Sequence, residues 1–181
     1  MGTGKSTLTN MLIGRDCVNT GVNGFSVTQE ITAIQSDVHP GLTVLDAPGF
    51  GDVSLPHEVW LENAIAGPEF QNLYACIFVI KATTKMKVVD DFMGHAIESL
   101  LSNLDPHRWL VIITRCGEVD GLLDDTEGPE KAKEIVADWF RKNEFPENLK
   151  QPTRIYRFEK VKEQIAAVED GTYPVGRWIA S

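Results

Sequence analysis

Two short stretches of the chain are continuously apolar, Cys76–Ile80 and Leu110–Ile113. Strands buried on both faces of a parallel sheet have this pattern, because helices cover the sheet on either side. Other short runs of β-forming residues alternate along the chain with longer amphipathic segments. The expected strands are Ile31–Val38, Leu42–Asp46, Tyr74–Lys81, Trp109–Thr114 and Thr153–Phe158. The expected helices are Lys5–Leu12, Pro56–Ala66, Val88–Leu104, Glu127–Asn143 and Lys160–Glu169. The alternation predicts an α/β fold of three layers, with a mostly parallel sheet between helices.

The length of 181 residues suits a single domain, with a core over about residues 1–170 and a C-terminal extension at 171–181. Lysine and arginine number 17 against 26 aspartates and glutamates, which gives a formal charge of −9. A surface this acidic argues against nucleic acid or an anionic membrane as the main partner, although a local pocket can still bind a small polyanion. No apolar run approaches the roughly 20 residues that a membrane span needs.

The three cysteines, Cys17, Cys76 and Cys116, lie far apart in the sequence. Their number and spacing fit neither a disulfide framework nor a metal site. We therefore expect a reduced, cytoplasmic environment.

The segment Gly2-Thr3-Gly4-Lys5-Ser6-Thr7 matches the second half of a phosphate-binding loop, Gly-x-x-x-x-Gly-Lys-Ser/Thr. Glycines allow backbone N–H groups to turn toward phosphates, and the following helix adds the positive end of its dipole. In that arrangement Lys5 reaches the β- and γ-phosphates, Ser6 ligates Mg²⁺ and Thr7 contacts the α-phosphate. The alternative is a glycine-containing turn in which Ser6 caps an ordinary helix.

A strand that ends in an aspartate follows downstream, in Leu42-Thr-Val-Leu-Asp46-Ala-Pro-Gly49. In phosphate-loop proteins an aspartate at this place holds the metal, usually through water, and the amide of the glycine meets the γ-phosphate. The alternative is an ordinary Asp-x-Pro-Gly turn. Lys5 and Asp46 are 41 residues apart and occur in the order that a nucleotide site requires. The two motifs together predict that the chain binds a nucleotide with Mg²⁺.

Four segments of the chain have the sequences typical of a known family, namely Gly4–Thr7, Leu12–Arg15, Ser26–Thr28 and Asp46–Phe50. Together they resemble the immune-associated nucleotide-binding GTPases (the AIG1 family, called GIMAPs in vertebrates), relatives of the septins and the chloroplast-import GTPases. The resemblance covers about residues 1–160 and implies a G domain that binds GTP and GDP with Mg²⁺. It also implies that Thr28, in the first switch, ligates Mg²⁺ when GTP is bound and releases it after hydrolysis. Thr32 is the nearest competitor for that role.

The strand Leu110–Thr114 and the following Arg115 resemble the Thr-Arg form of the family's guanine motif, which implies that Thr114 and Arg115 contact the nucleotide. In the family, an acidic residue three or four positions after the threonine pairs with the guanine N1–H and 2-amino groups. This sequence has Gly117 at the first of these positions and Glu118 at the second. Guanine preference therefore rests on Glu118 or on a shifted loop, with Arg115 over the base. The alternative for residues 118–127 is a solvated surface turn.

The residue after Asp-x-x-Gly is Phe50, whereas a Ras-like GTPase carries a glutamine there that orients the attacking water. We therefore expect slow hydrolysis, driven by charge neutralisation from Lys5 and Mg²⁺ and by amides around Gly4 and Gly49. The water-orienting group would come from elsewhere, such as a second subunit, and the resemblance implies that GTP-bound G domains assemble. The alternatives are a nucleotide-binding module that does not hydrolyse GTP and an ATP-using phosphate-loop protein. After the last strand, Phe158-Glu159 occupies the place where the family's closing loop meets the base, and we expect Phe158 in the core.

The first expected helix begins at Lys5 with no strand before it. A phosphate loop normally follows the central strand of the sheet. Without that strand, Leu42–Asp46 and Tyr74–Lys81 would each have an unpaired edge. We therefore expect the chain to lack its first strand.

Overall fold

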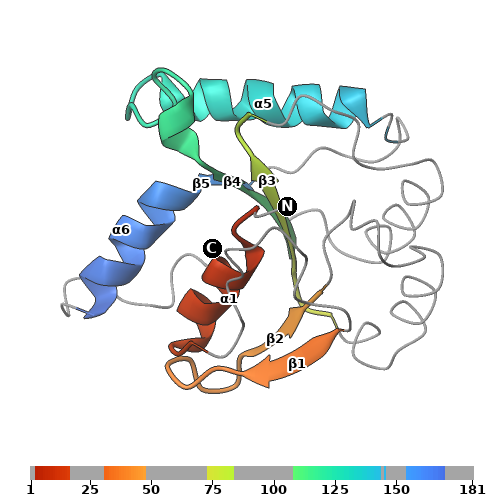
Figure 1. Cartoon of the computed structure of the whole chain (residues 1–181), viewed down its shortest axis with the longest axis vertical. Coiled ribbons are helices and arrows are strands. Elements are labelled where there is room, and N and C mark those ends of the chain that lie inside the picture. The colour runs from red at the N-terminus through yellow and green to blue at the C-terminus, as the bar shows by residue number, and fades with distance from the viewer. Residues whose placement is uncertain are drawn as a thin grey trace.

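The computed structural model describes residues 3–16, 31–47, 73–83, 108–143, 145 and 154–169. The elements, in chain order, are α1 (Lys5–Ile13), β1 (Thr32–Gln35), β2 (Thr43–Asp46), β3 (Cys76–Lys81), β4 (Trp109–Thr114), the 3₁₀ helix η2 (Cys116–Glu118), α5 (Gly128–Lys142), β5 (Arg154–Arg157) and α6 (Phe158–Glu169). Every expected strand is present, with ends that differ from the prediction by a few residues at most (Figure 1). The expected helices Pro56–Ala66 and Val88–Leu104 lie outside the described residues.

Strand β4 lies at the centre of a parallel three-stranded sheet with the order β3-β4-β5. Lys81 is opposite Thr114 in one pair, and Leu110 is opposite Arg154 in the other. Strands β1 and β2 form a separate antiparallel pair. Because β3, β4 and β5 are parallel, their carboxyl ends meet at one edge, which is where α/β proteins bind ligands.

The core lies on both faces of β4, whose six residues are all buried. The odd-numbered residues of β4 pack with α5, where Val136 and Trp139 belong to the same cluster. The even-numbered Leu110 and Ile112 pack with α1 and α6, and Phe158 joins them as expected. Figure 1 shows α5 on one face of the sheet and α1 and α6 on the other. The described residues therefore form the predicted three layers.

The turn between β1 and β2 covers the carboxyl end of α1. The Asp37 N–H donates to the Ile13 carbonyl oxygen at 2.8 Å, and Ser36 Oγ donates to the Leu12 carbonyl oxygen at 2.7 Å. The last carbonyls of a helix have no partner within the helix, so the turn satisfies them. Gly14 ends α1 with a φ of 85°, and a Cβ there would lie only 2.4 Å from Val38 Cγ1. The close approach of this turn therefore requires glycine.

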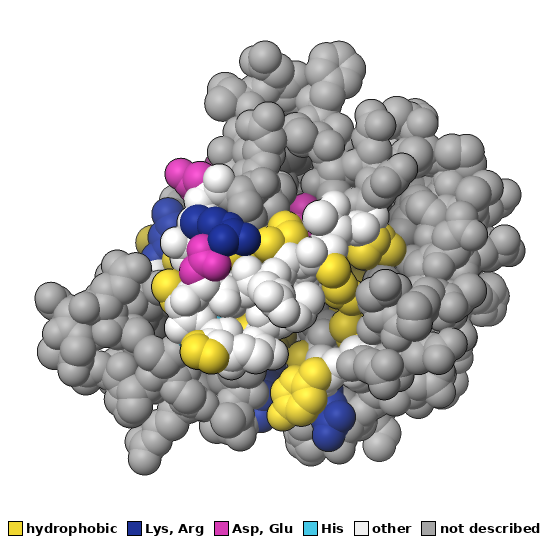
Figure 2. All heavy atoms as spheres, turned by 90° about the horizontal axis from the view of Figure 1, so that it is seen from below, with side chains coloured by type: hydrophobic (Ala, Val, Ile, Leu, Met, Phe, Trp, Pro, Cys, Tyr) yellow, Lys and Arg dark blue, Asp and Glu magenta, His cyan; other side chains and the backbone are white. Residues whose placement is uncertain are grey.

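The face seen from the β1–β2 side carries basic and acidic side chains next to one another, among apolar and uncharged groups (Figure 2). One exposed ion pair joins the end of α1 to the turn, with Arg15 Nη1 2.6 Å from Asp37 Oδ2. Among the helices of the described segments, none has the length and apolar character to cross a membrane.

Candidate nucleotide site

The N-terminus of α1 has the features of a phosphate site. Its cap residue is Gly4, with a φ of 92°, and a Cβ on Gly4 would lie 3.2 Å from Thr114 Cγ2. Among the described residues no side chain caps the helix, and its first turn contains no acidic residue. The positive end of the helix dipole is therefore not neutralised from within the helix. Ser6 lies inside the helix, so the alternative in which Ser6 serves as an ordinary cap is wrong.

The side chain of Thr114 joins the phosphate-loop segment to the sheet. Its buried Oγ1 lies 2.9 Å from the Thr3 carbonyl oxygen, to which it donates, and 3.2 Å from the Ile80 carbonyl oxygen. The Ala82 N–H donates to the Thr114 carbonyl oxygen at 3.0 Å. Residues 111 positions apart are thus held together at the carboxyl ends of β3 and β4. The structure therefore brings the predicted phosphate segment and the predicted base segment to one edge.

Thr3 carries an unusual hydroxyl group. Its Oγ1 is buried and has no hydrogen-bond partner within the described part of the chain. Buried polar groups are almost always hydrogen-bonded, so this hydroxyl suits a ligand that brings hydrogen-bonding oxygens. Together with Lys5 and the uncapped end of α1, it forms a donor set that fits a phosphate group.

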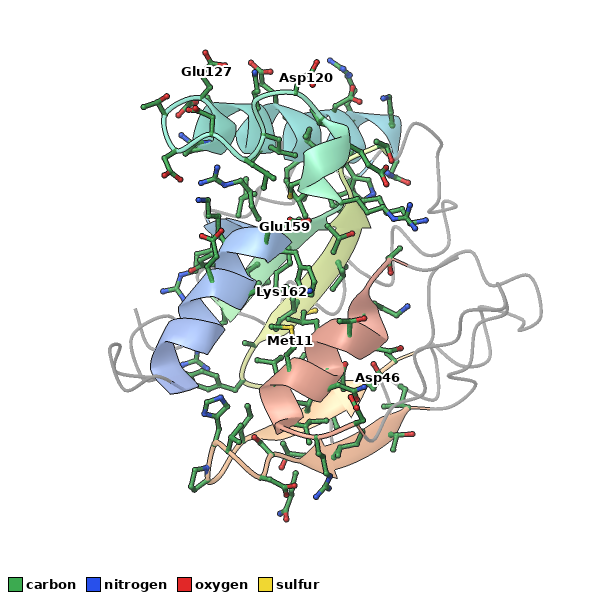
Figure 3. All side chains as sticks on the ribbon, turned by 60° about the vertical axis from the view of Figure 1, so that its left-hand side comes forward. Met11, Asp46, Asp120, Glu127, Glu159 and Lys162 are labelled. Carbon is green, nitrogen blue, oxygen red and sulfur yellow. The ribbon has the colours of Figure 1, made fainter. Side chains whose placement is uncertain are left out.

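Asp46, at the end of β2, is the predicted metal residue, and its side chain is buried beside α1 (Figure 3). Thr9 Oγ1 of α1 donates to Asp46 Oδ1 at 3.0 Å. The hydroxyl of Ser6 and the carboxylate of Asp46 are hard oxygen donors, which are the ligands that Mg²⁺ prefers. These residues therefore fit a magnesium ion. Thr32, the competitor for the switch threonine, lies in β1 opposite Asp46.

The predicted base segment turns sharply after β4. Arg115 has a φ of 57° and, among the described residues, is the one non-glycine residue with a positive φ. Its Nη1 donates to Glu118 Oε1 at 3.0 Å, and Thr83 Oγ1 donates to Glu118 Oε2 at 3.3 Å. Both oxygens of Glu118 therefore already accept hydrogen bonds from the protein.

A second carboxylate, that of Glu159, lies at the same edge. It belongs to the first turn of α6, and its buried Oε2 has no hydrogen-bond partner within the described residues. The carboxylate lies beside the buried thiol of Cys116, which donates to the Ile113 carbonyl oxygen at 3.2 Å, and burial, followed by the neighbouring Glu159 carboxylate, raises the pKa of Cys116 to about 12. Figure 3 shows Glu159 where α6 begins, whereas Asp120 and Glu127 lie in the loop at the N-terminal end of α5.

Sequence reasoning placed Phe158-Glu159 near the base but gave Glu159 no role. The sequence carries one signal for Glu159, an acidic residue two positions after the last strand. The sequence does not show that one oxygen of this carboxylate is buried, which depends on how the chain packs around the start of α6.

The acidic loop between η2 and α5 is fixed by cations from three elements. Arg157 Nη1 donates to the carbonyl oxygens of Leu122 at 3.0 Å and Asp124 at 2.6 Å. Lys160 Nζ lies 3.0 Å from a carboxylate oxygen of Asp125, and Lys131 Nζ donates to a carbonyl oxygen of the loop at 3.1 Å. Most residues of the loop are exposed, as the alternative of a solvated surface turn predicts, and these contacts hold its backbone against β5, α5 and α6.

Several predicted site residues lie outside the described part of the chain. They are Gly2, Thr28, Gly49 and Phe50. Lys5, Ser6 and Thr7 lie in the first turn of α1, at the edge where Thr3 and Thr114 meet.

No family model matches the chain, and no curated protein matches it. Solved structures of similar fold include that of a dimerization-deficient mutant of Toc33 from Arabidopsis thaliana. It is 16% identical with a TM-score of 0.53, over 86% of this chain and 66% of that one. Another is a structure of the chloroplast translocon components atToc33 and psToc159, for whose GTPase activity dimerization is important. It is 14% identical with a TM-score of 0.56, over 86% of this chain and 65% of that one.

The similarity to these two solved structures shows the fold of this chain. This chain has the G-domain fold of the phosphate-loop NTPases, as predicted. Both neighbours are chloroplast translocon proteins, so the finer resemblance to the immune-associated GTPases stays a prediction.

Proposed function

We propose that the chain binds GTP and GDP with Mg²⁺ and hydrolyses GTP slowly. The observation that carries this proposal is the 2.9 Å hydrogen bond from Thr114 Oγ1 to the Thr3 carbonyl oxygen. It joins the end of the phosphate loop to the strand that leads into the base segment. In this proposal one bound nucleotide contacts both the phosphate loop and the base segment.

In this proposal the phosphates lie at the N-terminus of α1. The N–H groups around Gly4 and the ammonium group of Lys5 oppose the phosphate charge. Ser6 and Asp46 would hold Mg²⁺, and Thr28 and the amide of Gly49 would complete the site as the sequence implies. Bound Mg²⁺ supplies further neutralisation of charge on the β- and γ-phosphates.

We further propose that Glu159 reads the guanine base. Guanine presents two adjacent donors, N1–H and the 2-amino group, and adenine lacks this pair. A buried carboxylate oxygen without a partner needs a donor, whereas both oxygens of Glu118 already have one. In this arrangement Glu118 holds Arg115 in its turn, and Arg115 is left to cover the base.

The test is a comparison of GTP, GDP and ATP on the same protein. Binding is measured by calorimetry with Mg²⁺, and phosphate release is measured in single-turnover reactions. Tight binding of GTP and GDP over ATP, with slow release of phosphate from GTP, supports the proposal. Binding without phosphate release favours a module that does not hydrolyse GTP, and preference for ATP favours an ATP-using phosphate-loop protein.

A further inference from the structure

Thr9 is a buried polar residue to which the phosphate-loop motif gives no role. It lies in α1 four residues after Lys5 and three after Ser6, so the three side chains leave the same side of the helix. Thr9 is 6% exposed, and the residue that it meets, Asp46, is 4% exposed. Its hydroxyl therefore works in a nearly water-free environment, where a hydrogen bond to a carboxylate is strong.

The contact joins two elements that the magnesium site must keep in register. Thr9 Oγ1 donates to Asp46 Oδ1 at 3.0 Å, across 37 residues of sequence. A threonine in a helix often turns its hydroxyl to the carbonyl oxygen one turn back. Here it points across to the end of β2 instead.

From this geometry we infer that Thr9 is a positioning residue that aims the Asp46 carboxylate at the magnesium site. The inference rests on the proposed function, because it assumes that Asp46 takes part in binding Mg²⁺ with the nucleotide. A carboxylate attached to the chain by rotatable bonds has several orientations. The Thr9 hydroxyl holds one carboxylate oxygen and so favours one of these orientations. Because the two oxygens belong to one rigid group, the direction of the second oxygen is then set as well.

Two substitutions separate the hydroxyl group from the shape of the side chain. Thr9→Val keeps the branched shape and removes the donor, while Thr9→Ser keeps the donor and removes a methyl group. Thr9→Ala removes the same donor without placing a methyl group beside the carboxylate, so it replaces Thr9→Val if that variant does not fold. Thr43→Val is the matched control, because Thr43 lies on the exposed side of the same strand, β2.

The experiment measures the affinity of the full chain for GDP and for a non-hydrolysable GTP analogue, once with Mg²⁺ and once with EDTA. The ratio of the two affinities reports the contribution of the metal. We expect Thr9→Val to reduce this ratio about tenfold or more, since losing a hydrogen bond to a charged group typically has an effect of that size. Thr9→Ser and Thr43→Val should keep the ratio of the unchanged protein, and affinities in EDTA should agree among all variants.

A purely structural role gives a different result. If Thr9 only holds α1 against β2, Thr9→Val lowers the melting temperature of the nucleotide-free protein and lowers both affinities alike, so the ratio stays the same. That outcome overturns the inference and leaves the proposed function intact. If the unchanged protein binds nucleotide equally well with Mg²⁺ and with EDTA, the magnesium site of the proposed function fails, and the role of Thr9 fails with it.

Discussion

Lys5 and Ser6 are neighbours in the first turn of α1, and the proposed function gives them different roles. In that proposal Lys5 supplies a positive charge, and Ser6 supplies one ligand to the metal. We predict that Lys5→Ala and Ser6→Ala each weaken binding of Mg²⁺-GTP about 10- to 150-fold, the effect of about 1.5–3 kcal/mol from a lost charge-assisted contact. Calorimetry measures the affinities, and Ser6→Ala should lose less in EDTA than with Mg²⁺.

The matched control for the lysine is Lys133→Ala. Lys133 is exposed on α5 and pairs with Glu130 on the same helix, away from the edge where Thr3 meets Thr114. The Lys133→Ala variant should bind nucleotide with the affinity of the unchanged protein. Equal affinity in all of these variants would mean that the nucleotide, if bound at all, lies elsewhere.

Single substitutions can also show whether Glu159 or Glu118 reads the base. Glutamine keeps the shape of either side chain and replaces one acceptor oxygen with a donor. We predict that Glu159→Gln reduces the preference for GTP over ATP about 5- to 150-fold, because a mispaired buried polar group costs about 1–3 kcal/mol. Glu118→Gln, whose carboxylate is already paired with Arg115 and Thr83, should reduce it less. The reverse order, measured by competition binding, would assign the base to Glu118.

At the scale of the elements, the turn that leads into α5 depends on one carboxylate. Asp124 Oδ1 accepts from the N–H groups of Thr126 at 2.7 Å and Glu127 at 3.0 Å. A hydrogen bond from the Thr126 hydroxyl, followed by these backbone bonds, lowers the pKa of Asp124 from 3.8 to about 2. A group whose pKa is lower in the folded protein stabilises it above the unfolded pKa, and that contribution is lost as the pH falls through the folded value.

We therefore predict that Asp124→Asn is less stable than the unchanged protein above about pH 4 and that the difference narrows as the pH falls toward 2. Asparagine keeps an acceptor oxygen at this position, so the comparison isolates the charge. Urea unfolding at several pH values between 6 and 3 measures it. Glu134→Gln, at an exposed position of α5, is the control and should give a difference that does not change with pH in this way. A constant difference for Asp124→Asn would show that its charge does not stabilise the turn.

The bounds of the helices and strands show which features of the fold can be predicted from the sequence and which cannot. Strand β4 was predicted to the residue, because a strand buried on both faces is apolar throughout and Asp105-Pro106 precedes it as a clear break. Strand β1 is shorter than predicted, since the run to Val38 continues into the turn that caps α1. Helix α6 begins two residues earlier than predicted, at the aromatic Phe158, which packs into the core from the helix.

The candidate site likewise has a part that the sequence predicts and a part that depends on packing. The spacing of Gly4, Lys5 and Asp46 predicts a phosphate and metal end, because backbone geometry and charge demand those residue types, and this assignment stays a prediction. The sequence could not predict the contacts around the site, since Thr9, Thr114 and Glu159 meet partners 34 or more residues away. Hydroxyls and carboxylates of this kind are common in any chain, and only packing distinguishes the ones that matter.

At the scale of the whole molecule, the formal charge of −9 opposes self-association, and the sequence places no water-orienting residue after Gly49. We nevertheless predict that the rate of GTP hydrolysis per molecule rises with protein concentration, because a group donated across a two-fold dimer would stabilise charge on the transferred phosphoryl group. In well-studied systems an arginine supplied in this way accelerates hydrolysis about 10³–10⁵-fold.

The measurement is phosphate release per molecule from about 1 to 100 μM protein, a range over which interfaces of about −8 to −5.5 kcal/mol become populated. Light scattering of the GTP-analogue and GDP forms follows the dimer in parallel. Moderate salt should favour pairing, since it screens the repulsion between two acidic chains over distances beyond about 10 Å. A slow rate that stays constant over this range, in a protein that remains monomeric with either nucleotide, would exclude activation by pairing. A constant rate despite a dimer would mean that the partner covers the site without donating the group that the lone domain lacks.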